Sequence, residues 1–391
     1  MINSPTIERF AMSKRFDIIG SLLRPDNLLK YKREIENRED IHYPFYNDFE
    51  GYEETEEKAI ADIVKKQIEH GIQVISDGEF SKAFWHLDFL WGMDGIKRYI
   101  SDSGFKFKDL DNQTKFETRK DIGLELLGNL SGKNHHFIHI YKKIEKYADG
   151  HTVKLCIPSP AHMFGNFVAR NNYIGPYKTK GELAADLIKA YKEFVEEYAQ
   201  VGGEILQMDD CIWQIFADDN PSSPYLGKPF QEILPIMEEF IEINNAIIDF
   251  GKTTGLKMWT HNCRGNYKSR SMSEGSYTKL AAYFLKKQRY DRFFLEWDDD
   301  RAGSLEALKV FQERDGEVVL GLLSSKTGTL CNEDRAKTML KEASQILDKE
   351  RLLLSHQCGF ASCDNGNELN EQQQWAKIDQ GQKLAKEFWG E

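Results

Sequence analysis

The 391-residue sequence lacks any run of about 18 consecutive apolar residues, the length that a membrane-spanning helix needs. The stretch from Met1 to Arg15 is polar and lacks the apolar core of a secretion signal. Basic residues are also few, because 52 lysines and arginines against 63 aspartates and glutamates leave a net charge of −11. Such a balance disfavours nonspecific binding to nucleic acid. We therefore expect a cytoplasmic protein that acts without a membrane or nucleic acid.

Cysteine is scarce as well, with six residues in the whole chain. A chain of this size, with 40% hydrophobic and 12% aromatic residues, can build a sizeable core without disulfides. The cysteines are therefore expected to be free thiols. No low-complexity segment or linker divides the sequence, so residues 1–391 are predicted to form a single catalytic domain.

Apolar runs of strand length alternate with runs of helix length along the chain. The predicted strands cover residues 17–23, 73–77, 153–157, 204–208, 257–260, 293–297, 318–323 and 352–355. The predicted helices cover residues 52–69, 180–200, 230–253, 277–288, 304–314, 332–348 and 370–388. Eight strands favour an α/β fold of the closed (β/α)8 type, a TIM barrel, over an open sheet. The polar region 94–150 interrupts the alternation and is predicted to be an insertion between the second and third strands.

Polar residues gather at the predicted carboxyl ends of these strands. They are Ser21, Asp77, Glu79, Ser159, Asp209, Asp210, His261, Cys263, Glu296, Asp298, Lys326 and Cys358. The active site of a (β/α)8 barrel lies at this end of the strands. We therefore expect these side chains to surround one site.

In the ranges 260–263 and 355–358 a histidine stands two residues before a cysteine, at the end of a predicted strand. Side chains two residues apart on a strand point to the same face. Imidazole and thiolate are ligands of tetrahedral zinc. Two ligand sets fit this spacing. His261, Cys263, His356 and Cys358 would form a closed structural site, whereas Glu296 in place of His356 would leave a carboxylate that an incoming thiol can displace.

Six phrases together resemble the catalytic domain of cobalamin-independent methionine synthase, in its shorter single-barrel relatives. They are Ile19-Gly20-Ser21, Asp77-Gly78-Glu79, Leu206-Gln207-Met208-Asp209-Asp210, His261-Asn262-Cys263, Leu295-Glu296 and Gln357-Cys358-Gly359. Each phrase is a weak signal, but their order and spacing over residues 17–360 are specific. Only the region 94–150 is poorly matched. The resemblance implies the barrel type that this family shares with the porphyrinogen decarboxylases.

The resemblance also implies what the site holds. It gives a Zn²⁺ ion bound by His261, Cys263, Glu296 and Cys358, with His356 outside the ligand set. It places the amino acid homocysteine near Ile19, Gly20, Ser21, Glu79 and Asp209. Backbone groups at a glycine turn can approach a carboxylate closely, and acidic side chains can hold an ammonium group.

The sequence departs from the family in two respects. The full-length enzymes carry a second, amino-terminal barrel that grips the folate polyglutamate, and 391 residues leave no room for it. The histidine that donates a proton after the seventh strand is replaced here by Lys326. The general acid is therefore predicted to be Lys326, Asp210 or a water molecule. Trp213, Trp259, Trp297 and Phe164 are candidates for stacking on a flat donor ring, although core packing is the commoner role of such residues.

The function implied is zinc-dependent transfer of a methyl group to the thiol of homocysteine, forming methionine. The expected partners are homocysteine and a methyl donor, with a folate-type donor favoured, and a homodimer is one open option. Two alternatives remain: a zinc-dependent alkyltransferase acting on another thiol or donor, and a zinc-stabilised barrel that only binds a ligand. A porphyrinogen-type decarboxylase ranks last, because it has no need of a histidine, cysteine and glutamate cluster.

Overall fold

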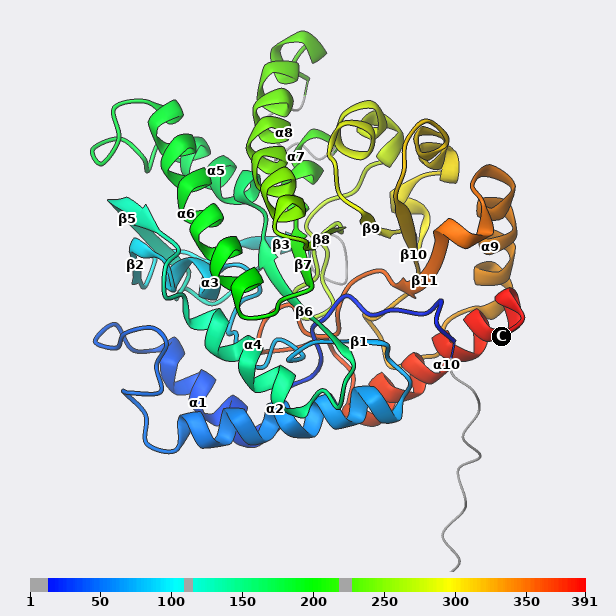
Figure 1. Cartoon of the computed structure of the whole chain (residues 1–391), viewed down its shortest axis with the longest axis horizontal. Helices are drawn as coiled ribbons and strands as arrows, with labels where there is room; N and C mark the ends of the chain where they lie inside the picture. The colour runs from blue at the N-terminus through cyan, green and yellow to red at the C-terminus, as the bar shows by residue number, and fades with distance from the viewer. Residues whose placement is uncertain (1–12, 109–114, 218–226) are drawn as a thin grey trace, which may run out of the picture.

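A curled sheet of seven parallel strands lies at the centre of the molecule (Figure 1). The computed structural model describes residues 13–108, 115–217 and 227–391. The strands run in the order β1 (Val74–Ile75), β6 (Thr152–Pro158), β7 (Ile205–Asp209), β8 (Lys257–Asn262), β9 (Arg292–Glu296), β10 (Glu317–Leu323) and β11 (Leu352–His356). Each coincides with a predicted strand within a few residues, so seven of the eight predicted strands and their parallel order are confirmed.

The predicted first strand, residues 17–23, is not a strand. Its backbone lies between β11 and β1, where Asp17 N–H donates to the Leu354 carbonyl (3.0 Å) and Leu22 N–H donates to the Gly78 carbonyl (2.9 Å). A φ of +148° at Gly20 interrupts the extended conformation between these two contacts. Side chains bind the intervening carbonyls, for example Lys154 at Ile18 O (2.5 Å). Hydrogen bonds from side chains therefore replace a strand ladder at this edge.

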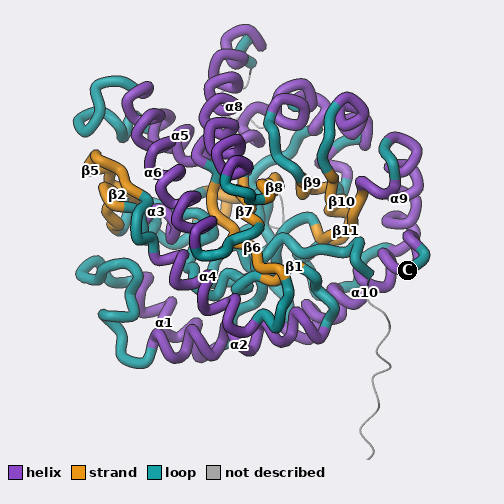
Figure 2. The backbone as a smooth tube through the Cα atoms, viewed as in Figure 1, coloured by secondary structure: helices purple, strands orange, loops and turns teal. Residues whose placement is uncertain are grey.

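Helices cover the outside of the sheet, so that its parallel strands lie inside a layer of helices (Figure 2). They are α1 (Asp26–Glu36), α2 (Tyr52–Glu69), α3 (Leu87–Trp91), α4 (His136–Tyr147), α5 (Pro160–Ala169), α6 (Lys180–Gln200), α7 (Gln214–Ala217), α8 (Phe230–Thr253), α9 (Glu333–Ile346) and α10 (Glu371–Trp389). The predictions for 52–69, 180–200 and 230–253 match α2, α6 and α8 residue for residue. Side-chain caps fix several starts; Thr179, for example, accepts the Glu182 N–H of α6 at 3.2 Å.

The segments 277–288 and 304–314, predicted as α-helices, instead form short 3₁₀ turns, which are wound more tightly than an α-helix, and one π-type turn, which is wound more widely. They are η2 (Tyr277–Lys279), the π-type η3 (Ala281–Leu285) and the 3₁₀ segment η5 (Leu305–Glu313). The further 3₁₀ turns are η1 (Cys211–Trp213), η4 (Asp300–Ala302) and η6 (Lys349–Arg351). Arginine side chains bind carbonyls there: Arg314 donates to Leu285 O (2.6 Å) and Arg351 to Phe311 O (2.9 Å). These contacts satisfy groups that a continued α-helix would have bonded.

The predicted insertion, 94–150, holds two small antiparallel pairs and one covering helix. Strand β2 (Asp94–Tyr99) pairs with β5 (Gly123–Ser131), and β3 (Lys106–Lys108) pairs with β4 (Lys115–Glu117). Helix α4 follows and packs on α2, as a barrel helix between β1 and β6 would. The part of the predicted insertion that adds to a barrel therefore ends with β5.

The core has two layers, on the two faces of the curled sheet. A small cluster fills its inside and consists of Ile19, Ile205, Trp259, Phe294, Val319 and Leu353. The larger cluster lies between the outer face of the sheet and the helices. Consecutive strand residues point to opposite faces, so Ile205 packs inside while its neighbour Leu206 packs against the helices.

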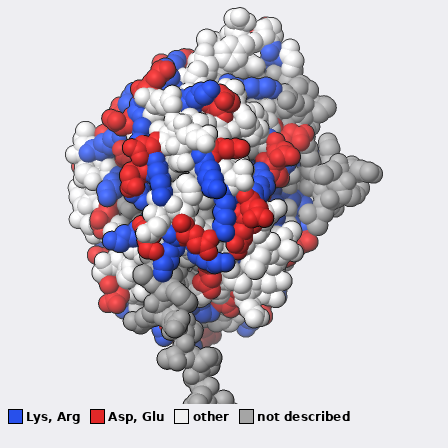
Figure 3. All heavy atoms as spheres, turned by 90° about the vertical axis from the view of Figure 1, so that its right-hand side faces the viewer, with Lys and Arg blue, Asp and Glu red and all other residues white. Residues whose placement is uncertain are grey.

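Charges of both signs alternate on the face that Figure 3 shows. Ion pairs of this kind join α9 to α10, where Lys337 contacts Glu387 at 2.9 Å and Lys383 contacts Glu333 at 3.7 Å. Exposed pairs contribute about 0–1 kcal/mol each to stability, so these contacts add little to the packing of the two helices. In the described ranges, no helix combines the length and the apolar composition that crossing a bilayer demands.

The start of α4 depends on a neutral histidine, and we expect acid to destabilise the protein there. The buried ring of His135 accepts the Phe137 N–H at Nδ1 (3.1 Å) and donates from Nε2 to Phe89 O (2.7 Å). Burial lowers the pKa of His135 to about 4. An unfolded histidine titrates near 6.5, so the unfolded state gains the proton first as the pH falls. The free energy of unfolding should therefore drop by about 3 kcal/mol between pH 6.5 and 4 on account of this residue.

His135→Asn tests this expectation, because asparagine can cap the helix without titrating. Urea unfolding at pH 7 and pH 4.5 should show a smaller acid loss in this variant than in wild type. His139→Asn is the matched control, since His139 is 48% exposed. An equal acid loss in wild type and His135→Asn would show that this ring does not control acid stability.

Candidate metal and ligand site

A cavity of about 440 Å³ opens at the carboxyl ends of the parallel strands. Asp209, the last residue of β7, and His261, near the end of β8, project into it. Loops that follow β1 and β11 add Glu79 and Cys358. Segments far apart in the sequence therefore meet at one end of the sheet, as the strand-end pattern predicts.

A cluster of sulfur and nitrogen atoms lies at the floor of this cavity. The Sγ of Cys263 is 3.6 Å from that of Cys211 and 3.8 Å from that of Cys358. The ligand atoms of Cys211, His261 and Cys263 all lie within 4.8 Å of one another. Two thiolates on one tetrahedral zinc ion, with Zn–S bonds of about 2.3 Å, are roughly 3.8 Å apart. The side chains present thus fit a zinc ion in type and in spacing.

Contacts within the cluster and burial shift the pKa values of its members. Contact with the Cys211 sulfur and burial hold the pKa of Cys263 well above its usual range, and contact with Cys263 and burial do so for Cys358. Burial alone would lower the pKa of His261, but its hydrogen bond to Cys358 raises it to about 9. A metal ion that binds here replaces these protons.

Glu296 and His356 lie outside the cavity lining. Glu296 ends β9, and its Oε2 accepts the Arg264 N–H (2.8 Å) while Oε1 accepts from Arg301 (3.1 Å). The ring of His356 packs edge-on against Phe16 and Phe360, with centroids 5.8 and 4.9 Å away. Burial lowers the pKa of His356 to about 3, so this ring is neutral.

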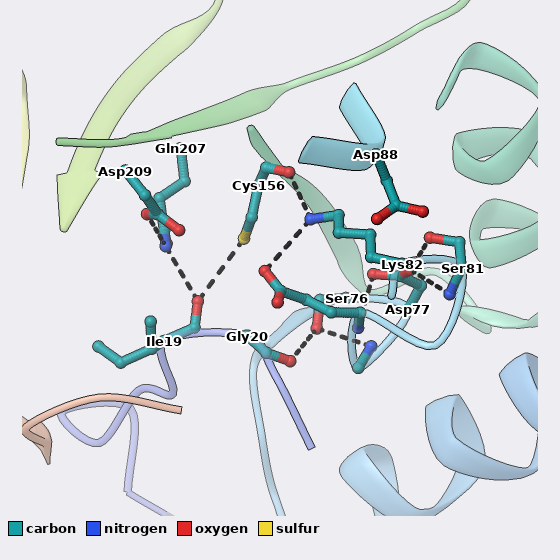
Figure 4. A network of polar contacts seen from close by, with 12 residues as sticks. Ile19, Gly20, Ser76, Asp77, Ser81, Lys82, Asp88, Cys156, Gln207 and Asp209 are labelled. Atoms are coloured by element: carbon teal, nitrogen blue, oxygen red, sulfur yellow. Dashed lines mark hydrogen bonds and ion pairs between the residues drawn. The ribbon is translucent and has the colours of Figure 1, made fainter. Parts of the chain in front are cut away.

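Two acidic side chains line the cavity beside the cluster. Glu79 is 3% exposed. Its Oε1 contacts Lys82 Nζ at 3.2 Å, whereas the Oε2 of Glu79 has no hydrogen-bond partner among the described residues. Lys82 also donates to the Cys156 carbonyl (2.6 Å), as Figure 4 shows. This second bond fixes the lysine that pairs with Glu79. Burial raises the pKa of Glu79, and Lys82 opposes this shift. Burial likewise raises the pKa of Asp209, whose Oδ1 accepts from Gln207 at 2.8 Å.

The segment Ile19-Gly20-Ser21 forms the adjoining wall. Gln207 donates to the Ile19 carbonyl (3.0 Å) and Ser76 Oγ donates to the Gly20 carbonyl (3.0 Å), as Figure 4 shows. A Cβ atom at Gly20 would meet the Cys156 sulfur at 3.0 Å, so the close approach depends on glycine. Ile19 and Ser21 line the cavity, whereas Gly20 shapes the turn between them.

Neither of the two predicted proton donors lines the cavity. Asp210 is fully buried behind it and accepts from Ser159 Oγ (2.6 Å), Trp213 Nε1 (2.7 Å) and Asn244 Nδ2 (2.7 Å). Burial raises the pKa of Asp210 to about 6, and these hydrogen bonds oppose the shift. Lys326 is half-buried. Burial and Glu296 raise the pKa of the nearby Asp298 to about 7, and the charge of Lys326 opposes this shift.

The aromatic wall of the cavity is made of residues that the sequence did not single out. They are Phe84, Trp85, Phe105 and Phe107. The candidates Trp213, Trp259, Trp297 and Phe164 are core residues and lie outside the lining. Two further lining residues, His86 and His162, have ring centroids 5.5 Å apart. Burial lowers the pKa of His162 to about 4 and that of His86 further, so both rings are neutral.

Two proteins of Bacillus subtilis are similar to this chain over nearly its whole length. No family model matches it. The protein YxjH of Bacillus subtilis is 35% identical over 379 residues, which cover 96% of this chain and 94% of YxjH. The chain belongs to the family of YxjH. A second B. subtilis protein, YxjG, is 32% identical to this chain, and the match covers 96% of this chain and 94% of YxjG. Both relatives are described as uncharacterized.

Two solved structures have a similar fold over nearly the whole chain. A Listeria monocytogenes protein, provisionally assigned as a vitamin-B12-independent methionine synthase, is 27% identical with a TM-score of 0.67, and the match covers 96% of this chain and 98% of that one. A B12-independent methionine synthase from a Shewanella species, solved with selenomethionine, is 18% identical with a TM-score of 0.65, covering 97% and 98%. The second likeness concerns the fold.

The structure brings most of the predicted site residues of this YxjH-family protein to one cavity and separates the rest. Ile19, Ser21, Glu79, Asp209, His261, Cys263 and Cys358 line it. Gly20, Asp210, Glu296 and Lys326 do not. Cys211 is not among the predicted site residues, although it directly follows the strand-end pair Asp209-Asp210.

Proposed function

We propose that this protein is a zinc-dependent methyltransferase that methylates the thiol of homocysteine. The observation that carries the proposal is the cluster of His261, Cys263 and Cys358. It lies beside the buried acids Glu79 and Asp209, at the carboxyl ends of the parallel strands. The likeness to a protein assigned as a methionine synthase supports it. The resemblance of the sequence phrases adds Glu296 as a ligand and a folate-type methyl donor.

His261, Cys263 and Cys358 would hold the zinc ion, which when bound favours the thiolate form of a substrate thiol near neutral pH. Glu79 and Asp209 would hold the substrate ammonium group through charge-assisted hydrogen bonds. The turn at Ile19-Gly20-Ser21 would receive its carboxylate. The wall of Phe84, Trp85, Phe105 and Phe107 offers a flat donor ring an apolar surface for stacking and excludes water. The general acid stays a prediction among Asp210, Lys326 and a water molecule.

Zinc content and a donor panel test the proposal together. The purified protein should carry one zinc ion per chain and form methionine from homocysteine. The donors to compare are 5-methyltetrahydrofolate with one and with three glutamates, methylcobalamin and S-methylmethionine. Full methyl transfer by a zinc-free protein would refute the mechanism. Zinc that is bound tightly but does not respond to thiols would favour the ligand-binding barrel.

Glu79→Gln should raise the KM for homocysteine about 10–100-fold, because the loss of one charge-assisted hydrogen bond costs roughly 1.5–3 kcal/mol. The free Oε2 of Glu79 is the expected acceptor of the ammonium. The thiol 4-mercaptobutyrate, which lacks the amino group, is the matched control substrate. Wild type should discriminate strongly against it, and Glu79→Gln should lose most of that discrimination. Equal discrimination by both proteins would place the ammonium elsewhere.

A further inference from the structure

We infer that a second part of the cavity wall is the binding site of the methyl donor, and that it takes a flat heteroaromatic ring with an anionic tail. This inference rests on the proposed function and names the side chains that would recognise the donor. His86 and His162 would bind the edge of the ring, and Lys106 and Arg170 would bind the tail. All four line the same cavity as the cluster.

Trp85, His86 and His162 form a compact group of aromatic rings in this wall. The ring centroid of Trp85 lies 4.6 Å from that of His86 and 5.0 Å from that of His162, and the two imidazole centroids are 5.5 Å apart. Trp85 N–H donates to the Ser362 carbonyl (3.0 Å), in the segment after β11. His162 N–H donates to Ser159 Oγ (3.0 Å), at the start of α5. These bonds hold the rings in place, which lowers the ordering cost when a ligand ring stacks on them.

Each imidazole has a nitrogen that the protein leaves without a partner. The Nδ1 atoms of His86 and His162 are buried and have no hydrogen-bond partner among the described residues. His135, whose role is structural, instead uses both of its ring nitrogens. Because the Nδ1 of each cavity ring is buried, Nε2 is the nitrogen left to face the cavity that the ring lines. Both rings are neutral, and a neutral imidazole offers one N–H donor and one acceptor, which suits the edge of a heteroaromatic ring.

Two cationic side chains lie at the mouth of the cavity beside these rings. Lys106 belongs to β3 and Arg170 ends α5, and both are exposed although they line the cavity. The guanidinium of Arg170 lies over the ring of Phe105, 5.6 Å from its centroid. In the ranges that the structure describes, neither cation is paired with an acidic side chain. An anionic tail would therefore receive charge-assisted hydrogen bonds here without displacing an existing partner.

Strands β3 and β4 fix the position of this wall. Phe107 and Phe116 both pack on Tyr267, with ring centroids 5.4 and 5.8 Å from that of Tyr267. Tyr267 lies in the segment that follows β8, so the strand pair is held against the carboxyl ends of the parallel sheet. Phe105 N–H donates to Thr118 Oγ1 (2.8 Å), which joins the two strands at their outer end. The predicted insertion therefore supplies part of the donor wall.

Calorimetric binding of tetrahydrofolate to the whole, zinc-loaded protein tests the ring site without turnover. His86→Phe and His162→Phe keep an aromatic ring against Trp85 but remove the nitrogens, and each should weaken binding about tenfold or more. The KM for homocysteine should stay unchanged. His139→Phe, at an exposed histidine outside the cavity, is the matched control and should bind like wild type. Unchanged binding in both cavity variants would overturn the inference.

Probes with and without a tail test the two cations. Wild type should bind tetrahydrofolate at least about tenfold more tightly than 6-methyltetrahydropterin, which has the same ring system without the tail. Lys106→Gln combined with Arg170→Gln should lose most of this difference. The control pair Lys65→Gln with Arg289→Gln, at exposed side chains outside the cavity, should keep it. Flavin mononucleotide distinguishes the kind of tail, and tighter binding of this phosphate-bearing ring than of tetrahydrofolate would overturn the assignment to the methyl donor.

The variants at the mouth of the cavity change exposed side chains, so they decide even if the two histidine variants do not fold. Equal binding of the two pterins by wild type would overturn the tail site. A protein that binds tetrahydrofolate through these residues but transfers no methyl group would refute the proposed function and leave the ring site standing. Methyl transfer from 5-methyltetrahydrofolate with the same donor KM in wild type and in every cavity variant would overturn this inference alone.

Discussion

Cys263→Ser and Cys358→Ser are each expected to lose bound zinc and to lower methyl transfer by at least about 10³-fold. Both sulfurs are buried, and Cys263 is the centre of the cluster, within 3.8 Å of the other two sulfurs. A serine hydroxyl is a much poorer zinc ligand than a thiolate, since it does not ionise near neutral pH. Zinc per chain by elemental analysis, and methionine formed per minute, measure the two losses.

Cys363→Ser is the matched control for this pair. Cys363 is 2% exposed and lines the same cavity, so the change has a similar cost in packing. Its sulfur belongs to neither ligand set, and we expect this variant to keep its zinc. If Cys358→Ser also kept one zinc ion per chain and normal activity, the proposed site would be wrong.

The sequence could predict the parallel sheet because its signals are local. Strands such as β7 and β8 are apolar runs bounded by turns, and buried parallel strands take this form. The segment 17–23 reads like the others but is not a strand. Its carbonyls are bound by Lys154, Gln207 and Ser76, and no local pattern announces contacts from side chains so distant in sequence.

The same limit applies to the candidate metal site. The histidine and cysteine pairs were visible because residues two apart on a strand share a face. Cys211 was missed because it follows β7, whereas its partner Cys263 follows β8. The parallel register pairs Asp209 with His261, so Cys211, two residues further on, comes beside Cys263. Cys211 can be recognised as a member of the cluster only when the pairing of β7 with β8 and its register are known. The orientation of Glu296 depends on Arg264 and Arg301, which no spacing rule predicts.

Asp210→Ala is expected to lower the free energy of unfolding by about 3–5 kcal/mol or more. The carboxylate of Asp210 is fully buried and accepts three close hydrogen bonds and a longer one from Gln288 (3.4 Å). Alanine removes every acceptor at once. Ser159 and Trp213 then lose their partners in the protein interior, where an unpaired donor is costly. Urea unfolding, with zinc chelated in both proteins, measures the loss apart from any metal effect.

Asp210→Asn separates the structural role of Asp210 from the proton-donor role that the sequence predicts. Asparagine can keep its oxygen at the Oδ2 position, where Trp213 and Asn244 donate, and place its NH₂ group beside the Ser159 hydroxyl, which can also accept. This variant should therefore be more stable than Asp210→Ala. The backbone of Asp210 is hydrogen-bonded to His261 and Asn262 of β8, so loss of its side-chain contacts should disturb the cluster from behind. A folded Asp210→Asn protein should therefore bind zinc more weakly and lose activity in proportion, with zinc supplementation restoring part of it. Full zinc occupancy with no methyl transfer would instead identify Asp210 as the proton donor.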